Sequence, residues 1–192
     1  MLADTEDTWQ LLFQQQRMRY QEPKLVLFTN TVQSACGHAE AVMGPLHCPV
    51  DHKVYIDQGF YQQLKTQHNA PGDFAQAYVI ARKVGHHVQT LLGISQERGK
   101  GQHGLNLAQA NPLSVKLELQ ADCFAGLWAH HTEKAKQILE QGDIAKALNA
   151  ASAIGDDRLQ NQARGYASPE SFTHGTSGSV LSGLNRVLQT PR

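Results

Sequence analysis

The chain has 192 residues, and its 17 Lys and Arg side chains balance 17 Asp and Glu side chains, which gives a formal net charge of zero. This length predicts one domain over residues 1–192, and the neutral balance favours no contact with nucleic acid or an anionic membrane surface. No apolar run approaches the ~20 residues that cross a bilayer, and MLADTEDTWQ lacks the basic and apolar regions of a signal peptide, so we expect a soluble domain.

The first third of the chain predicts one helix and two strands. Residues 5–19 form an amphipathic helical pattern that Thr5 or Asp7 can cap, and its apolar face holds Trp9, Leu12 and Phe13. Residues 24–30 and 53–57 are short runs rich in β-branched and apolar residues between turn residues, so we expect strands there.

Three cysteines leave two alternatives open. Cys36 and Cys48 bracket the Gly- and Pro-containing stretch CGHAEAVMGPLHC, which we expect to be an irregular excursion between the two strands. A disulfide between them would close a small loop and stabilise the fold by about 3 kcal/mol. The alternative is two reduced thiols in a reducing compartment. Cys123 stands by itself in an apolar stretch.

From Asp73 onward the pattern is helical, interrupted by a Gly-, Gln- and Asn-rich loop near residues 97–111. Asn111 can cap the next helix, and Pro112 fits its first turn. Strands followed by helices predict an α+β fold that is mainly helical, with a small N-terminal sheet.

The helix that contains YVIARKVGHHVQTLLG has one residue with metal-binding potential. Its predicted buried stripe comprises Phe74, Ala77, Tyr78, Ala81, Val84, Gly85, Val88, Leu91 and Leu92. Residues 82 and 86 lie one turn apart at the edge of this stripe, which is the spacing by which two histidines hold one zinc ion. Only His86 is present, because position 82 is Arg. Taken without other residues, a Gly-His-His sequence on a helix is more often a packing feature.

The next helix brings two carboxylates together. Its apolar stripe comprises Leu117, Ala121, Phe124, Ala125 and Trp128. Glu118 and Asp122 lie one turn apart beside that stripe, and such a pair repels unless a cation lies near. The simple interpretation is a solvated acidic edge. The alternative is a metal ligand with a carboxylate that supports it.

Several segments in order resemble the neutral zinc metallopeptidase family of bacteria over nearly the whole chain. They are GPLHCPVDHKVYID, GDFAQAYVIARKVGHHVQTLLG, ELQADCFAGLWA, ALNAASAIGDDRLQ and SFTHGTS. The resemblance implies a zincin-like fold of the glutamate-ligand type, in which two helix histidines and a downstream glutamate hold zinc. The glutamate of the His-Glu-x-x-His motif then acts as general base on zinc-bound water.

Residue by residue, the resemblance assigns four positions. His86 matches the second histidine ligand and Glu118 matches the third ligand. Asp122 matches the carboxylate that orients a ligand histidine. His174, in FTHGTS, matches a histidine that we expect to face the substrate.

The same resemblance fails at the two residues that catalysis needs most. Arg82 stands at the first ligand and Lys83 at the general base, so the motif reads RKVGH. A guanidinium has no available lone pair and cannot ligate zinc. His103 is a conceivable substitute ligand that nothing in the sequence positions. Val180 and Gly183 also depart from the Arg and Trp that follow His-Gly-Thr-Ser in the family.

We therefore expect a catalytically inactive relative that binds no zinc, although zinc is the family's cofactor. Arg82 would replace the metal's charge beside Glu118 and Asp122. A peptide or protein ligand could still occupy the old cleft. The alternatives are a metallopeptidase inactivated by mutation at residues 82 and 83, or one that uses a substitute ligand, and a structural or interaction module. The resemblance implies a location outside the cytoplasm, as a soluble part of a membrane-anchored protein.

Overall fold

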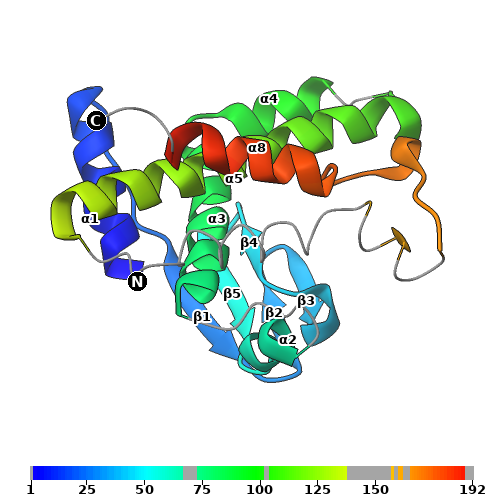
Figure 1. The fold of residues 1–192 in the computed structure, drawn as a ribbon, viewed down its shortest axis with the longest axis horizontal. Coiled ribbons are helices and arrows are strands. Elements are labelled where there is room, and N and C mark those ends of the chain that lie inside the picture. Colours follow the sequence, from blue (N-terminus) through cyan, green and yellow to red (C-terminus); the bar gives the residue numbers. More distant parts are fainter. Residues whose placement is uncertain are drawn as a thin grey trace.

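The computed structural model describes residues 2–66, 73–101, 104–137, 157, 160–161 and 165–188. It combines α-helices and β-strands and is mostly helical (Figure 1). The elements are, in chain order, α1 (Leu2–Gln15), β1 (Lys24–Phe28), β2 (Thr31–Ser34), β3 (Gly37–Glu40), η1 (Ala41–Met43), β4 (Leu46–Cys48), β5 (Lys53–Asp57), α2 (Phe60–Thr66), α3 (Asp73–Leu91), α4 (Ile94–Gly101), α5 (Leu107–Lys136), η2 (Pro169–Ser171) and α8 (Ser177–Leu188). The α+β class expected from the order of strands and helices is confirmed at this level.

The strands form two small sheets near the N-terminus, as predicted. One sheet has the order β1-β5-β4, in which β1 is parallel and β4 antiparallel to the central β5. The other is the β2–β3 hairpin. Strand β5 matches its predicted bounds, and β1 ends at Phe28 instead of residue 30.

The prediction of an irregular excursion over residues 36–48 is wrong. That stretch contains β3, the short helix η1 and β4. Gly37 turns the chain between β2 and β3 with φ +113, a conformation that favours glycine. A disulfide of 2.02 Å joins Cys36 to Cys48, so the covalent link ties this hairpin to strand β4. The disulfide alternative is thus the one that the structure supports, and Cys123 keeps its thiol.

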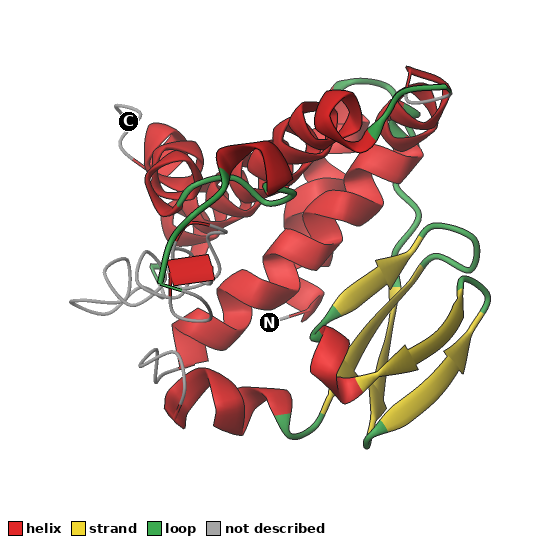
Figure 2. Ribbon diagram, turned by 90° about the vertical axis from the view of Figure 1, so that its right-hand side faces the viewer, coloured by secondary structure: helices red, strands yellow, loops and turns green. Residues whose placement is uncertain are grey.

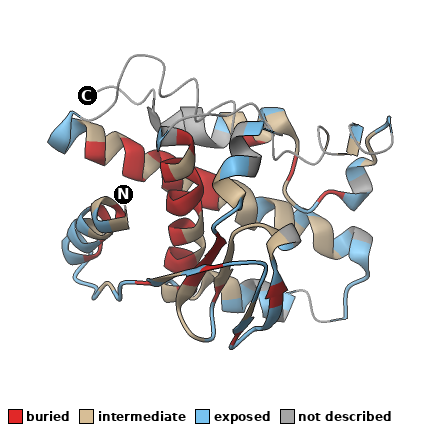
Figure 3. Cartoon of the chain, turned by 90° about the horizontal axis from the view of Figure 1, so that it is seen from below, coloured by how far each residue is buried: buried red, intermediate tan, exposed pale blue. Residues whose placement is uncertain are grey.

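Helix α3 is the central element of the described structure. It lies between the sheet on one side and helices α5 and α8 on the other (Figure 2). On the sheet side it contributes to an apolar cluster of Trp9, Phe13, Val54, Ile56, Ile80, Val84 and Val88. On the helix side it contributes to a second cluster of Ala75, Ala77, Tyr78, Val79, Ala81, Ala125, Trp128, Ala129 and Val180. Burial on both sides is visible in Figure 3, where most of α3 is coloured as buried. The prediction that Leu92 belongs to the buried stripe of this helix is wrong. Leu92 follows the last residue of α3, and it is 40% exposed.

Helix α1 begins earlier than predicted, and it packs against the C-terminal half of α5. It starts at Leu2, so Thr5 and Asp7 lie inside the helix and cannot cap it. Thr5 is buried, and its hydroxyl donates to the carbonyl of Leu2 at 2.6 Å. Trp9 meets Phe124 of α5 edge to face, with ring centroids 5.3 Å apart. The ammonium of Lys136 lies 2.8 Å from the carboxylates of Asp4 and Asp7.

The predicted loop over residues 97–111 is also wrong, because most of what is described there is helical. Helix α4 occupies Ile94–Gly101, and α5 begins at Leu107. Asn106 caps α5 through a capping box with Gln109, which satisfies two backbone N–H groups at the helix start. Asn111 therefore is not the cap, and Pro112 lies inside the helix.

None of the helices in the described ranges is both long enough and apolar enough to span a bilayer.

Candidate functional site

Helices α3 and α5 come close together at Gly85, and this approach positions the candidate site. A Cβ atom on Gly85 would lie 2.9 Å from the carbonyl oxygen of Ala121 and 3.2 Å from its Cα. Only glycine fits such a contact without a shift of the backbone. The close crossing brings residues 82 and 86 of α3 opposite residues 118 and 122 of α5, as the family resemblance implies.

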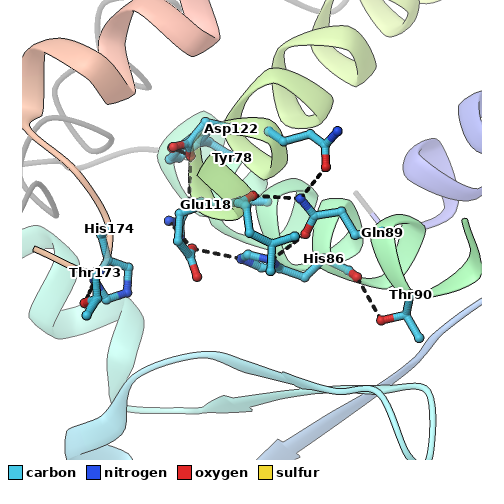
Figure 4. Close-up of polar contacts among 11 residues, drawn as sticks. Tyr78, His86, Gln89, Thr90, Glu118, Asp122, Thr173 and His174 are labelled. Atoms are coloured by element: carbon cyan, nitrogen blue, oxygen red, sulfur yellow. Dashed lines mark hydrogen bonds and ion pairs between the residues drawn. The ribbon is translucent and has the colours of Figure 1, made fainter. Parts of the chain in front are cut away.

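Arg82 joins the two carboxylates of α5. Its Nε donates to Oδ1 of Asp122 at 2.7 Å, and one terminal nitrogen donates to Oε2 of Glu118 at 2.7 Å. Oδ1 of Asp122 also accepts a hydrogen bond of 2.6 Å from the hydroxyl of Tyr78, one turn before Arg82 (Figure 4). Charge-assisted bonds of this length are the strong class of protein hydrogen bond. The prediction that Arg82 faces the carboxylate pair is consistent with this geometry.

This network lies inside the protein. Arg82 is 3% exposed and Asp122 is fully buried, whereas the Glu118 side chain is 20% exposed. The simple interpretation of Glu118 and Asp122 as a solvated acidic edge therefore does not hold. Oδ2 of Asp122 is also buried and has no hydrogen-bond partner among the described residues.

The charges of the network hold each other in place. Burial by itself would lower the pKa of Arg82, because it disfavours the charged guanidinium. The nearby carboxylates of Asp122 and Glu118 outweigh this effect, so the pKa of Arg82 is raised above its ordinary value. Burial likewise raises the pKa of Glu118, yet the hydrogen bond from His86 and the charge of Arg82 outweigh it, so that pKa falls well below its usual range. Arg82 and Glu118 are both ionised at neutral pH.

His86 reaches the same carboxylate and is held from behind by Gln89. Its Nε2 lies 3.1 Å from Oε2 of Glu118, and its Nδ1 lies 3.0 Å from Oε1 of Gln89. The amide nitrogen of Gln89 donates to the carbonyl of Leu117 at 2.7 Å and to Oε1 of Gln120 at 2.9 Å, which fixes the orientation of the Gln89 amide. Burial lowers the pKa of His86, and the bond to Glu118 opposes that fall. This is how proteins orient an imidazole ligand.

Lys83 is partly buried and does not resemble a general base. Burial and the charge of Arg82 lower its pKa to about 8, against the opposing attraction of Glu118 and Asp122. The ammonium is therefore mostly protonated at pH 7 and has no lone pair to accept a proton from water.

The remaining predicted positions lie elsewhere or outside the described residues. His174 lies on the loop before α8, where its Nδ1 is 3.1 Å from the hydroxyl of Thr173 (Figure 4). A substrate-facing role for His174 stays a prediction. His103 lies outside the described residues. Val180 is fully buried in the cluster with Tyr78 and Trp128, so this side chain belongs to the core.

Sequence reasoning missed two members of the site, Tyr78 and Gln89. Both were visible by spacing, because Tyr78 lies four residues before Arg82 and Gln89 lies three residues after His86. The helical spacing places Tyr78 in the apolar stripe, and its ring does pack there, but its hydroxyl extends to Asp122.

The residues of this site do not fit a zinc ion. The ligand set contains one imidazole and one carboxylate, and Oε2 of that carboxylate, Glu118, already accepts a hydrogen bond from the guanidinium of Arg82. Within the ranges that the structure describes, no group of three or more His, Cys, Asp or Glu side chains is arranged to hold a metal ion.

Comparison with known proteins places these observations in a family context. A family model described as "Putative neutral zinc metallopeptidase" matches residues 1–191. The uncharacterized protein YpfJ of Escherichia coli K12 is 51% identical over 186 residues, which cover 97% of this chain and 64% of that protein. The uncharacterized protein Rv2575 of Mycobacterium tuberculosis H37Rv is 43% identical over 168 residues, which cover 82% of this chain and 56% of that protein. The chain thus spans less than two thirds of the length of these relatives, and no solved structure matches it.

Proposed function

Because this chain belongs to the neutral zinc metallopeptidase family, we propose that it is a metal-free, catalytically inactive member of zincin-like fold, acting as a single domain that binds a peptide or protein. The observation that carries the proposal is the guanidinium of Arg82, bonded at 2.7 Å to both Glu118 and Asp122. A permanently charged side chain there stands in for the zinc ion. Its single positive charge offsets part of the charge of the two carboxylates, and its hydrogen bonds link them, so no metal is needed to hold them side by side.

Loss of catalysis follows from the chemistry of two side chains. Peptide hydrolysis by a zinc enzyme needs a third protein ligand and a base that accepts a proton from the metal-bound water. Arg82 offers no lone pair for the first role. Lys83, with a pKa of about 8, is mostly a proton donor at pH 7 and cannot fill the second.

A surviving binding role is supported by the edge of the three-stranded sheet. Strand β4 is an edge strand, since its described partner in the sheet is β5. It lies against α3 through His47, whose Nε2 is 3.3 Å from Nδ1 of His87. An extended peptide would add by backbone hydrogen bonds to the side of β4 that has no strand partner among the described residues, a common mode of peptide recognition. The ligand would then lie beside the end of α3 that carries His86.

The test is a zinc titration of the parent beside the double variant Arg82→His with Lys83→Glu, which rebuilds the ligand and base positions. We expect the double variant to bind about one zinc ion per chain at this site, and His86→Ala in that background to abolish this binding. The parent should show no His86-dependent zinc. Zinc held by the parent as tightly as by the double variant, and lost on His86→Ala, would mean that Arg82 does not replace the metal.

Peptidase activity of the double variant is a separate readout. We expect it to return weakly or not at all, because Val180 in the core and Gly183 in α8 also differ from the family pattern. The Arg82→His single variant should bind zinc without activity, since the base is still missing.

A further inference from the structure

Lys83 is a cation on α3 that has no counter-ion among the described residues. It lies one residue after Arg82 and is partly buried. Within the described part of the chain, no hydrogen bond or ion pair joins its ammonium to another side chain. The two carboxylates whose charges act on it, those of Glu118 and Asp122, are already bonded to Arg82, and Glu118 also to His86. The charge of Lys83 is therefore open to a ligand.

Helix geometry places Lys83 between the edge strand β4 and the buried network of α5. Residues three and four positions apart on a helix are neighbours on its surface, and His86 and His87 stand in this relation to Lys83. His86 faces Glu118 of α5, whereas His87 faces His47 of β4. Burial is the main cause that lowers the pKa values of His47 and His86, and the positive charge of Lys83 is among the charges that add to it. The ammonium thus acts on both sides of this junction.

An unpaired ammonium in this position is unfavourable in the free protein. Water solvates it incompletely, and burial together with the charge of Arg82 lowers the pKa of Lys83 to about 8. An anion on a ligand would supply the missing hydrogen bonds, and bonds between charged groups are stronger than neutral ones. The anions of an unmodified peptide are carboxylates, carried by Asp and Glu side chains or by the C-terminus.

We propose that Lys83 selects peptides that place a carboxylate beside β4, an inference that rests on the peptide-binding role proposed above. A peptide strand that adds to β4 places one residue next to His47, on the sheet face from which His47 reaches α3. The side chain of that residue then lies over the turn of α3 that carries Lys83. Its carboxylate accepts hydrogen bonds from the ammonium. Arg82 holds the buried network together, and Lys83 recognises the ligand.

The experiment is calorimetric titration of the chain with short N-acetylated peptides of alternating Thr and Val around one central residue. One peptide has a central Glu and an amidated C-terminus, a second has a central Gln and a free C-terminal carboxylate, and the neutral third has a central Gln and an amidated C-terminus. We expect at least one acidic peptide to bind about tenfold or more tightly than the neutral one, the effect of a charged hydrogen bond. The peptide that gains affinity identifies whether a side chain or the C-terminus supplies the carboxylate.

Two variants assign this preference to Lys83. Lys83→Met removes the ammonium and should bind all three peptides alike. Without peptide it should melt at the temperature of the parent or above it, because an unpaired and partly buried charge is lost. Lys134→Met is the matched control, since it removes the same charge from an exposed position of α5. It should keep the preference of the parent.

The proposal is overturned if the neutral peptide binds as tightly as both acidic ones, or if Lys83→Met keeps the preference. It is also overturned if Lys83→Met melts well below the parent, which would make Lys83 a structural partner within the fold. Equal binding of all three peptides would leave the peptide-binding role intact. Binding of none of them would contradict that role as well, whereas the metal-free state is tested separately by the zinc titration.

Discussion

Arg82 decides the electrostatics of the buried network. It is the one cation that bonds Asp122, a fully buried carboxylate, within the described residues. A buried ion pair is weak evidence for added stability, because both charges lose their hydration. Removal of one partner is different, since it leaves the other charge buried and uncompensated. The guanidinium is thus required by its neighbours even if the whole network adds little to the free energy of unfolding.

The Arg82→Ala variant should lower the free energy of unfolding by about 3–5 kcal/mol, the usual cost of breaking a buried ion pair. Denaturant unfolding at pH 7 measures this change. The triple variant that adds Glu118→Gln and Asp122→Asn should recover part of the loss, because no unpaired charge remains. Equal destabilisation in the single and triple variants would show that Arg82 acts by packing.

Asp51 is a second carboxylate whose charge the fold uses. It accepts hydrogen bonds from the hydroxyl of Tyr55 at 2.6 Å and from the backbone N–H groups of Lys53 and Ala35 at 3.2 and 3.3 Å. Burial raises its pKa, but these bonds, first that of Tyr55, outweigh it and lower the pKa below the ordinary Asp value. The bonds join the turn before β5 to the β2–β3 turn.

A lowered pKa stabilises the fold at any pH above the unfolded value of about 3.9, and this stability is lost as the pH falls through the folded pKa. Asp51→Asn should therefore be less stable than the parent at pH 7, and this difference should shrink below about pH 4. Urea unfolding at both pH values measures it. Tyr55→Phe removes the shortest of these hydrogen bonds and keeps the ring. It should show the same pH dependence of stability, with a smaller loss of unfolding free energy at pH 7.

At the scale of elements, the site exists because α3 and α5 cross at Gly85. The backbone of Ala121 lies where any side chain at position 85 would go. A wider crossing would separate Arg82 from Glu118 and Asp122. Position 85 therefore sets the spacing of the network although it contributes no polar atom.

Gly85→Ala should lower the free energy of unfolding by about 1–3 kcal/mol, since overpacking outweighs the higher helix propensity of alanine. Gly99 in α4 is the matched control, because nothing lies within 4 Å of a Cβ built there. Gly99→Ala should be neutral or stabilise the protein by about 0.5–1 kcal/mol. If both variants were stabilised alike, the crossing would not be tight.

Elements with strong local patterns could be predicted from the sequence, and those defined by distant contacts could not. The β-branched run of β5 gave its exact bounds. The start of α5 was hidden because Asn106 and Gln109 look like loop residues, although together they cap the helix. The facing of α3 and α5 came from the resemblance to a family, since spacing along one helix does not say which helix it meets. Contacts such as His87 with Gln21, far apart in the chain, have no local signal.

At the scale of the molecule, the family resemblance and the Cys36–Cys48 disulfide together lead us to propose that this protein works outside the cytoplasm. Disulfides of this kind persist in oxidising compartments and are rare in the cytosol. Its 12-residue separation closes the loop that holds β3, η1 and the edge strand β4. The bond thus restrains the strand on which a peptide would dock.

Thiol titration of the denatured, unreduced protein should find one reactive thiol per chain, that of Cys123. Reduction should raise the count to three and lower the free energy of unfolding by about 3 kcal/mol, as expected for a loop of this length. Three thiols before reduction would contradict both the bond and the proposed compartment. Replacement of Cys36 and Cys48 together by Ser should reproduce the stability of the reduced protein.

The docking of Trp9 on Phe124 sets an order of events during synthesis. A ribosome that adds about 5–20 residues per second delivers Phe124 roughly 5–25 seconds after Trp9. Throughout that interval Trp9 can already pack on β5 and α3, whose Val54, Ile56 and Val84 share its apolar cluster, but not on Phe124. The part of the core between α1, β5 and α3 can therefore assemble first, and α5 completes it when it leaves the ribosome.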